Sequence, residues 1–359
     1  MKAAVCYEYG KPLSVEKVNL DPPQKGEVKV KVAATAVCHS DIHVLRGELG
    51  GGQLPIVAGH ETAGYIEEIG EGVISVKPGD HVVVSLLKSC RRCRQCVTGN
   101  PHLCETPFPL MTESRLHNMK GENLRHMVGT ATFAEYAIVD ESQVVKIADD
   151  MPMDRAALLG CGVITGFGAV VNRAKVETLS SVVVVGTGGV GLNAVQGAVF
   201  SGAYPIIAVD MLDSKLEAAR KFGATHTVNG SQGDAVEKVK EITSGKGADY
   251  VFVTVGSASA VQQSLDMVGT RGMLVVVGLP GMGATITIPP FLWGERMITS
   301  STMGTTRLSV DVPKLVDLYK AGQLKLDELI TKHYPLDEIN EAIESVERGE
   351  ALRNIIAFE

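Results

Sequence analysis

The sequence predicts an α/β protein of two domains, one mostly β and one built on a doubly wound parallel sheet. Up to about residue 160, short β-patterned runs such as 28–34, 64–69 and 81–86 alternate with turn signals. From Ser181 onward, buried strand patterns alternate with helical ones. A length of 359 residues suits about two domains of ordinary size.

The elements of the second domain follow in order. Ser181–Val185 is a continuous apolar run, as expected of a parallel strand covered on both faces. Ser214–Phe222 is predicted to be a helix that Ser214 caps and Gly223 ends. Three further strands are expected at 205–209, 250–255 and 273–277.

The last part of the chain is expected to return to the first domain. Residues 312–321 and 336–348 carry helical patterns after the strand–helix alternation has ended. We therefore predict a mostly-β domain formed by 1–162 and 303–359, and a parallel-sheet domain formed by 163–302.

Composition excludes several classes of function. A net charge of −7 without blocks of like charge argues against nucleic acid or an anionic membrane as partner. The most apolar segment, 182–200, contains five glycines and is a poor membrane span. No basic stretch followed by an apolar one opens the chain, so we expect no signal peptide and a cytoplasmic location.

Four of the seven cysteines lie in one short segment with the spacing C-x2-C-x2-C-x7-C. Four thiolates so close together can surround one tetrahedral zinc and leave no open position, which is typical of a structural site. Disulfides are disfavoured in a reducing compartment, whereas an iron–sulfur cluster remains a minority alternative. The four residues are Cys90, Cys93, Cys96 and Cys104.

A glycine-rich turn follows the strand pattern at 181–185 and opens an apolar helix. In this context Gly186 permits the tight turn, Gly188 lets the backbone approach a pyrophosphate, and Gly191 allows close packing of helix and strand. The whole motif, with Gly189 and Val190, predicts a dinucleotide site.

Asp210 ends the next strand pattern, 24 residues after Gly186. A carboxylate there can accept hydrogen bonds from both hydroxyls of the adenosine ribose and would repel a 2′-phosphate, which favours NAD over NADP. Lys215 is expected near the same ribose. The alternative is that Asp210 only caps the turn into the helix at Ser214.

A second set of metal-binding residue types is scattered along the chain. Cys38, His60 and Cys161 offer two thiolates and one imidazole, which suit zinc and leave one position for a substrate. Each of them alone could equally be a buried core residue. Their joint occurrence is what favours a catalytic metal.

These motifs together resemble the zinc alcohol dehydrogenases of the medium-chain dehydrogenase/reductase superfamily, along nearly the full length of the chain. The resemblance implies a GroES-like catalytic domain, a Rossmann coenzyme domain, NAD, two zinc ions per subunit, and a small alcohol or aldehyde as substrate. The matching segments are CHSDIH (38–43), GHE (59–61), the lobe 90–104, GTATFAEYAIVDE (129–141), GCGVITGFGA (160–169), GTGGVG (186–191) and LRNIIAF (352–358).

The resemblance also implies roles for residues of the catalytic centre. Cys38, His60 and Cys161 would hold the catalytic zinc, and Glu61 would ligate it transiently. Ser40 would bind the substrate oxygen, and His43 would pass the proton to solvent.

For the coenzyme, the resemblance places His39 and Arg353 at the pyrophosphate. Thr165 would pack near the nicotinamide, and the backbone of Val277 and Leu279 would hold its carboxamide. The 24 residues between Cys104 and Gly129 are similar to the long-loop, usually dimeric branch, so we expect a homodimer.

The substrate is the least constrained expectation. Leu49, Leu86 and Phe108 would line an apolar pocket. The glutathione-dependent formaldehyde branch typically has an acidic residue and an arginine near the positions of Leu49 and Phe108, so a thiol adduct is the alternative substrate. Cys161 and the complete four-cysteine lobe argue against a polyol dehydrogenase. The presence of Cys38, His60 and Cys161 argues against a non-catalytic, zinc-free relative.

Overall fold

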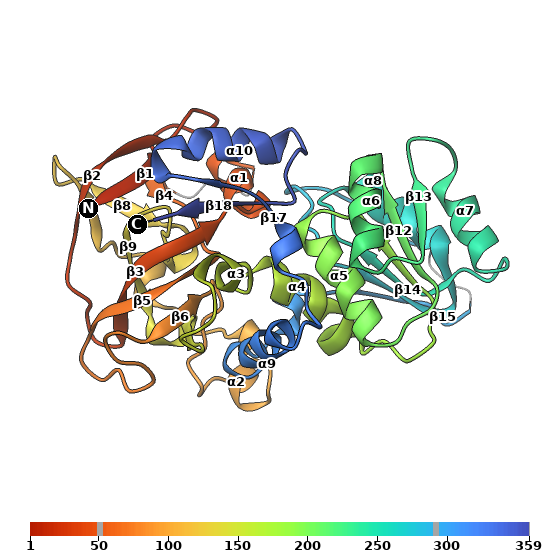
Figure 1. The fold of residues 1–359 in the computed structure, drawn as a ribbon, viewed down its shortest axis with the longest axis horizontal. Coiled ribbons are helices and arrows are strands. Elements are labelled where there is room, and N and C mark those ends of the chain that lie inside the picture. The colour runs from red at the N-terminus through yellow and green to blue at the C-terminus, as the bar shows by residue number, and fades with distance from the viewer. Residues whose placement is uncertain (49–52, 290–293, 359) are drawn as a thin grey trace. The chain divides into compact units, whose positions relative to one another are not determined.

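The structure is a computed structural model that describes residues 1–48, 53–289 and 294–358 (Figure 1). The chain forms two compact units. The first unit consists of Met1–Cys161 and Arg307–Glu359, and the second of Gly162–Thr306. The boundaries thus lie at 161/162 and 306/307, where the sequence analysis placed them at 162/163 and 302/303.

A small closed barrel and a larger sheet form the first unit. The barrel strands, in spatial order, are β1 (Lys2–Cys6), β2 (Ser14–Leu20), β7 (Leu116–Asn118), β8 (Asn123–His126) and β4 (Ile56–Val57). The larger sheet has the order β10 (Val144–Lys146), β6 (His81–Val84), β5 (Thr62–Ile69), β3 (Glu27–Ala36), β18 (Arg353–Ala357) and β17 (Ile330–Tyr334), and β9 (Tyr136–Asp140) also pairs with β3.

The end of the chain completes this unit. Strand β18 pairs antiparallel with β3 and lies between β3 and β17. The C-terminal strand therefore lies inside a sheet whose other strands come mostly from the N-terminal part of the chain. Among the described residues of this unit, five α-helices and six 3₁₀ helices accompany the strands. They are α1 (His39–Leu45), α2 (Arg94–Val97), α3 (Met153–Leu158), α9 (Leu308–Lys320), α10 (Ile339–Glu347), η1 (Pro101–Leu103), η2 (Pro109–Met111), η3 (Met127–Gly129), η4 (Glu141–Gln143), η8 (Asp327–Leu329) and η9 (Leu336–Glu338).

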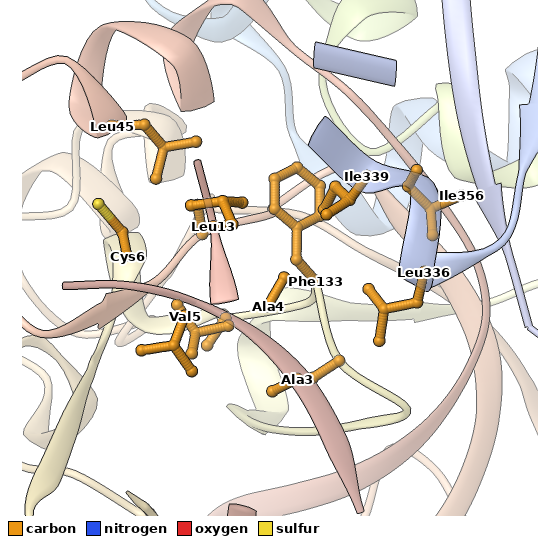
Figure 2. Close-up of a cluster of buried hydrophobic side chains, with 14 of the residues drawn as sticks. Ala3, Ala4, Val5, Cys6, Leu13, Leu45, Phe133, Leu336, Ile339 and Ile356 are labelled. Atoms are coloured by element: carbon orange, nitrogen blue, oxygen red, sulfur yellow. The ribbon is translucent and has the colours of Figure 1, made fainter. Parts of the chain in front are cut away.

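Figure 2 shows a buried cluster in which the two ends of the chain meet. Phe133 lies among Val5 of β1, Ile339 of α10 and Ile356 of β18, and each of these side chains is fully buried. Burying an aliphatic or aromatic side chain of this size contributes roughly 1.5–3 kcal/mol. The cluster therefore ties the C-terminal segment firmly to the barrel.

The second unit is a doubly wound parallel sheet, which confirms the predicted class. Its strands β11 (Val182–Val185), β12 (Ile206–Asp210), β13 (His226–Asn229), β14 (Ala248–Val253), β15 (Val268–Val276) and β16 (Met297–Ser300) lie in the order β13-β12-β11-β14-β15-β16. In chain order this is 3-2-1-4-5-6, the arrangement of dinucleotide-binding sheets. The helical segments are α4 (Gly162–Gly168), η5 (Ala169–Ala174), α5 (Gly189–Phe200), α6 (Asp213–Phe222), α7 (Ala235–Ile242), α8 (Ala258–Ser264), η6 (Leu265–Met267) and η7 (Met303–Thr305).

Two local predictions differ from the structure. Helix α6 begins at Asp213, and its N-cap is Leu212, so the prediction that Ser214 caps the helix was wrong. Gly223 does end the helix, with the left-handed φ of 111° that favours glycine. The predicted helix at 336–348 is divided into η9 and α10. In the described part of the chain, no helix is both long and apolar enough to cross a membrane.

Candidate metal centre and coenzyme loop

Three potential metal ligands from distant parts of the chain meet in the first unit. Cys38 precedes α1, His60 lies between β4 and β5, and Cys161 ends the first stretch of the unit. One potential ligand atom of each lies within 4.8 Å of those of the other two, and all three residues are buried. The structure thus brings together the set that the sequence singled out for a catalytic zinc.

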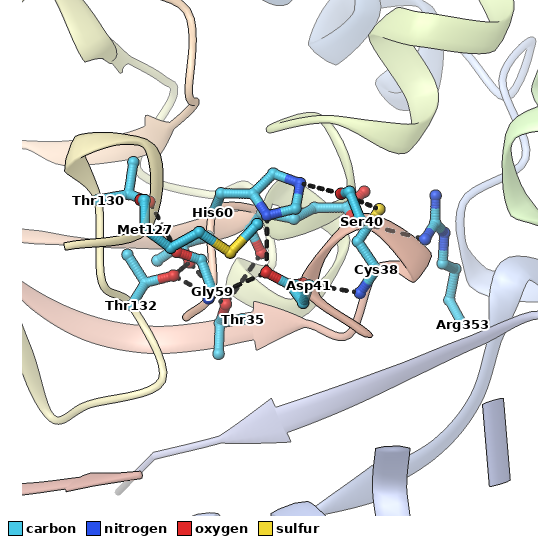
Figure 3. Close-up of polar contacts among 12 residues, drawn as sticks. Thr35, Cys38, Ser40, Asp41, Gly59, His60, Met127, Thr130, Thr132 and Arg353 are labelled. Atoms are coloured by element: carbon cyan, nitrogen blue, oxygen red, sulfur yellow. Dashed lines mark hydrogen bonds and ion pairs between the residues drawn. The ribbon is translucent and has the colours of Figure 1, made fainter. Parts of the chain in front are cut away.

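Asp41 holds two of these ligands in place, as Figure 3 shows. Its carboxylate accepts hydrogen bonds from the backbone N–H groups of Cys38 and Gly59, each at 3.0 Å, and from His60 Nδ1 at 2.9 Å. A proton on Nδ1 leaves Nε2 of His60 available to a metal. The sequence motifs assigned Asp41 no role, although its place three residues after Cys38 allows a capping interaction.

The charges of the site favour a bound cation. Burial alone would lower the pKa of His60, but the Asp41 carboxylate and the Cys38 sulfur raise it well above its usual value. A hydrogen bond from Cys161 holds the pKa of Cys38 well below the ordinary value, and the same bond raises the pKa of Cys161. Two sulfurs and one imidazole this close together match the donor set of zinc.

The other predicted residues of the centre lie beside this set. Ser40 Oγ is 3.3 Å from Cys38 Sγ and 3.2 Å from His60 Nε2. Glu61 Oε2 is 3.4 Å from Arg353 Nη1, and both side chains are buried. Burial would lower the pKa of Arg353, but Glu61 and the two cysteines raise it. Arg353, the predicted pyrophosphate residue, therefore forms an ion pair with Glu61 in this structure.

A buried group of threonine hydroxyls fixes the backbone around His60 (Figure 3). Thr130 Oγ1 donates to the carbonyl of Gly59 at 2.7 Å. Thr62 Oγ1 is 2.7 Å from Thr35 Oγ1 and 2.6 Å from Thr132 Oγ1. Gly59 has a φ of +94°, and a Cβ there would lie 2.6 Å from the N atom of Phe133, so the position requires glycine.

His43 and His39 both belong to α1. His43 Nδ1 lies 2.5 Å from Glu48 Oε2. His39 is the first residue of the helix and is exposed. Neither residue belongs to the potential ligand set.

The four-cysteine lobe forms a second potential metal centre. One sulfur of each of Cys90, Cys93, Cys96 and Cys104 lies within 4.8 Å of the others. Cys93 Sγ is 3.9 Å from Cys104 Sγ, close to the roughly 3.8 Å edge expected of a zinc–thiolate tetrahedron. Hydrogen bonds, first from Thr106, lower the pKa of Cys90 to about 5, whereas burial raises that of Cys96 to about 12.

The glycine turn of the second unit has the geometry that the motif predicts. Gly186 has a φ of +87°, and a Cβ there would lie 2.3 Å from Val255 Cγ1. A Cβ on Gly191 would lie 1.8 Å from the carbonyl oxygen of Gly186, so helix and strand pack too closely for a side chain. A Cβ on Gly188, the N-cap of α5, would meet no atom within 4 Å. The backbone is thus open where a phosphate would approach the helix N-terminus.

Asp210 contacts both the glycine turn and the start of α6. Its Oδ2 accepts from Thr187 N at 2.7 Å and from Thr187 Oγ1 at 3.0 Å. Its Oδ1 accepts from the backbone N–H groups of Met211 and Leu212. The carboxylate therefore does cap the turn before α6, and its orientation at the end of β12 is fixed.

The remaining predicted coenzyme residues also lie in the second unit. Thr165 belongs to α4 and is nearly buried, with Oγ1 3.6 Å from Met303 Sδ. Lys215 is buried in α6. Val277 is buried after β15, whereas Leu279 is 56% exposed. Their roles toward the coenzyme stay predictions.

Two of the three predicted substrate residues can be placed. Leu86 follows β6 and Phe108 precedes η2, and both are half-buried in the first unit. Leu49 lies outside the described residues.

Comparisons with known proteins match both units. The family described as "Alcohol dehydrogenase GroES-like domain" matches residues 24–149, and "Zinc-binding dehydrogenase" matches 189–321. An alcohol dehydrogenase class-3 from Cereibacter sphaeroides is 39% identical over 99% of both chains. A probable S-(hydroxymethyl)glutathione dehydrogenase from Schizosaccharomyces pombe is 41% identical, over 99% of this chain and 96% of its own. The crystal structure of benzyl alcohol dehydrogenase from Acinetobacter calcoaceticus has a TM-score of 0.92 and 36% identity, over 100% of this chain and 99% of its own.

Proposed function

Because this chain belongs to the zinc-dependent medium-chain alcohol dehydrogenases, we propose that it catalyses the reversible NAD-linked oxidation of a small apolar alcohol, primary or secondary. The observation that carries the proposal is the convergence of Cys38, His60 and Cys161 in one buried site. Three protein ligands leave a fourth position of a tetrahedral zinc for a substrate.

The ligand set and its surroundings fit that chemistry. When bound, zinc supplies a Lewis acid that makes an alcohol easier to deprotonate, and NAD supplies the hydride acceptor. Asp41 keeps Nε2 of His60 free for the metal. Ser40, whose Oγ is 3.2 Å from His60 Nε2, would take the proton of the substrate hydroxyl, and His43 would pass it to solvent. Glu61, a buried carboxylate next to His60 in the sequence, would ligate the metal transiently.

The second unit would bind the coenzyme through its glycine turn. Gly188 would admit the pyrophosphate to the N-terminus of α5. Asp210 would accept hydrogen bonds from the adenosine ribose and so select NAD, with Lys215 nearby. Thr165 would pack near the nicotinamide, and the backbone from Val277 to Leu279 would hold its carboxamide.

Two substrate classes compete. The half-buried Leu86 and Phe108 support an apolar alcohol, as does the similarity to a benzyl alcohol dehydrogenase. Several curated relatives, however, are S-(hydroxymethyl)glutathione dehydrogenases, and their similarity supports a thiol adduct equally well. The thiol adduct of formaldehyde is therefore our second candidate.

Initial rates of NAD reduction distinguish the two candidates. Primary and secondary alcohols, including benzyl alcohol, are compared with formaldehyde plus glutathione. Fast turnover of apolar alcohols without added thiol supports the first candidate. Turnover of the thiol adduct alone would show that the apolar pocket is not the substrate site, and the second candidate would stand.

We also propose that the protein is a homodimer. Within the described residues, β16 pairs with β15 on one side and with no strand on the other. Met297 of β16 and Ile288 nearby in sequence are exposed, and an open sheet edge beside apolar side chains suits pairing with a second copy. Light scattering should give twice the chain mass of 38.1 kDa, whereas a mass of one chain would exclude the dimer.

A further inference from the structure

We propose that Glu48 is a positioning residue that holds the imidazole of His43, so that Nε2 is the ring nitrogen that exchanges the proton. The proposal rests on the relay role assigned to His43 above. It adds a residue that no sequence motif indicated, and it predicts which ring nitrogen of His43 exchanges the proton.

The end of helix α1 brings the two residues together. Gly47 has a φ of +76°, and its N–H donates to the carbonyl of Val44 at 3.0 Å. The N–H of Glu48 donates to the carbonyl of His43 at 2.9 Å. These two bonds form a Schellman motif, which folds the second residue beyond the C-cap Arg46 back onto the last turn of the helix. The side chain of Glu48 is thereby carried to His43.

The contact between the side chains determines the tautomer. His43 Nδ1 lies 2.5 Å from Glu48 Oε2. The hydrogen bond from His43 lowers the pKa of Glu48, so the carboxyl group is ionised and can only accept. Nδ1 must then carry the proton. In the neutral ring the lone pair is consequently on Nε2.

A second contact steadies the carboxylate from its other side. Arg46 Nη1 is 3.9 Å from Glu48 Oε1, and Arg46 Nη2 is 2.6 Å from Glu347 Oε1 in α10. The side chains of His43 and Glu48 are 31% and 44% exposed, so water reaches the pair. Exposure suits the outer end of a proton relay. Because solvent screens exposed charges, we expect the contact between His43 and Glu48 to change the rate only modestly.

The test is the pre-steady-state burst of NADH formation by the zinc-loaded enzyme, which isolates proton loss and hydride transfer from product release. We compare Glu48→Ala and Glu48→Gln with Glu71→Ala, an exposed glutamate elsewhere in the same unit. Glutamine keeps the size and a hydrogen bond but can donate to Nδ1, so it no longer selects the tautomer. Both Glu48 variants should slow the burst about two- to five-fold, and Glu71→Ala should not.

Ring ¹⁵N shifts of labelled histidine give an independent readout. His43 should be protonated at Nδ1 in the wild type and in Glu71→Ala, and should be a mixture of tautomers in both Glu48 variants. A wild-type burst rate in Glu48→Ala, or an Nε2-protonated ring in the wild type, would overturn the proposal.

A double-mutant cycle separates this inference from the proposed function. In the His43→Ala background, Glu48→Ala should cause no further loss, because it acts only through the ring. If His43→Ala slows the burst but Glu48→Ala slows it equally in both backgrounds, the positioning role is wrong and the relay stands. If His43→Ala leaves the burst unchanged, the relay role falls, and the positioning role falls with it.

Discussion

His60 Nδ1 donates a hydrogen bond to Asp41 Oδ1 at 2.9 Å, and both side chains are fully buried. The bond fixes the ring orientation and the tautomer of a potential zinc ligand whose other nitrogen lies beside Ser40 and Cys38. The other oxygen of Asp41 accepts from the backbone of Cys38. One carboxylate thus aligns two of the three ligand segments before a metal binds.

Replacing Asp41 by Asn should weaken zinc binding at this site about ten- to a hundred-fold, the usual cost of losing a carboxylate behind a ligating histidine. The amide oxygen of Asn is uncharged, so it stabilises the metal-binding imidazole less than the carboxylate does. Zinc content after dialysis against a graded chelator series measures the effect.

Asp150→Asn is the matched control, because Asp150 is an exposed partner of Lys320 in the same unit. It should keep its zinc. If Asp41→Asn and the control retained zinc equally, Asp41 would have no part in the metal site.

The two cysteine groups should respond differently to single substitutions. Cys104→Ser should remove one zinc per chain and make the lobe 90–104 sensitive to protease, because four thiolates hold that segment together. Cys38→Ser should instead abolish turnover while largely sparing NAD binding. Metal analysis, limited proteolysis and coenzyme titration measure these outcomes. Unchanged turnover of a fully purified Cys38→Ser enzyme would refute the catalytic assignment.

Asp210→Gly should relax the preference for NAD. Losing the hydrogen bonds that the ribose hydroxyls would donate to a charged acceptor costs about 1.5–3 kcal/mol. The KM for NAD should therefore rise roughly ten- to a hundred-fold. The KM for NADP should change little or fall, because a repulsive charge is gone. Ratios of kcat/KM for the two coenzymes measure the effect. An unaltered ratio in a variant that melts like the wild type would show that Asp210 only caps its turn.

The sequence predicted those parts of the site that depend on short spacings. The lobe cysteines lie within 15 consecutive residues, and the glycine turn within six. Their chemistry therefore follows from local order alone. Cys38, His60 and Cys161 are far apart in sequence. Their residue types indicated a metal, and the resemblance to a known family then implied that they share one site. The structure then brings their ligand atoms together.

The supporting contacts could not be predicted in the same way. Asp41 acts on a histidine 19 residues away, and Thr62 contacts Thr132 across 70 residues. Such pairs depend on how β3, β5 and the segment before β9 pack. The Ser214 cap was wrong for a local reason, because α6 starts one residue earlier than the pattern indicated.

His126 makes the stability of the first unit depend on pH. It is buried in β8, and its Nε2 accepts a hydrogen bond from the backbone N–H of Arg115 at 3.0 Å. Burial, and then the charge of Arg115, lower the pKa of His126 to about 4. The ring is therefore neutral in the folded protein down to acid pH, whereas in the unfolded chain it gains a proton near pH 6.5.

Because the unfolded state binds this proton more readily, the contribution of His126 to the free energy of unfolding is complete above about pH 6.5 and is lost as the pH falls toward 4. Between pH 7 and 4.5 the loss should be about 2–3 kcal/mol. In His126→Gln the side chain does not titrate. Urea unfolding should therefore show that the difference in free energy of unfolding between wild type and variant shrinks by about 2–3 kcal/mol as the pH falls from 7 to 4.5. Taking the difference between the two free energies of unfolding cancels the contributions of the carboxylates and the zinc ligands, because these groups titrate in both proteins. A gap that is constant with pH would mean that folding does not lower the pKa of His126.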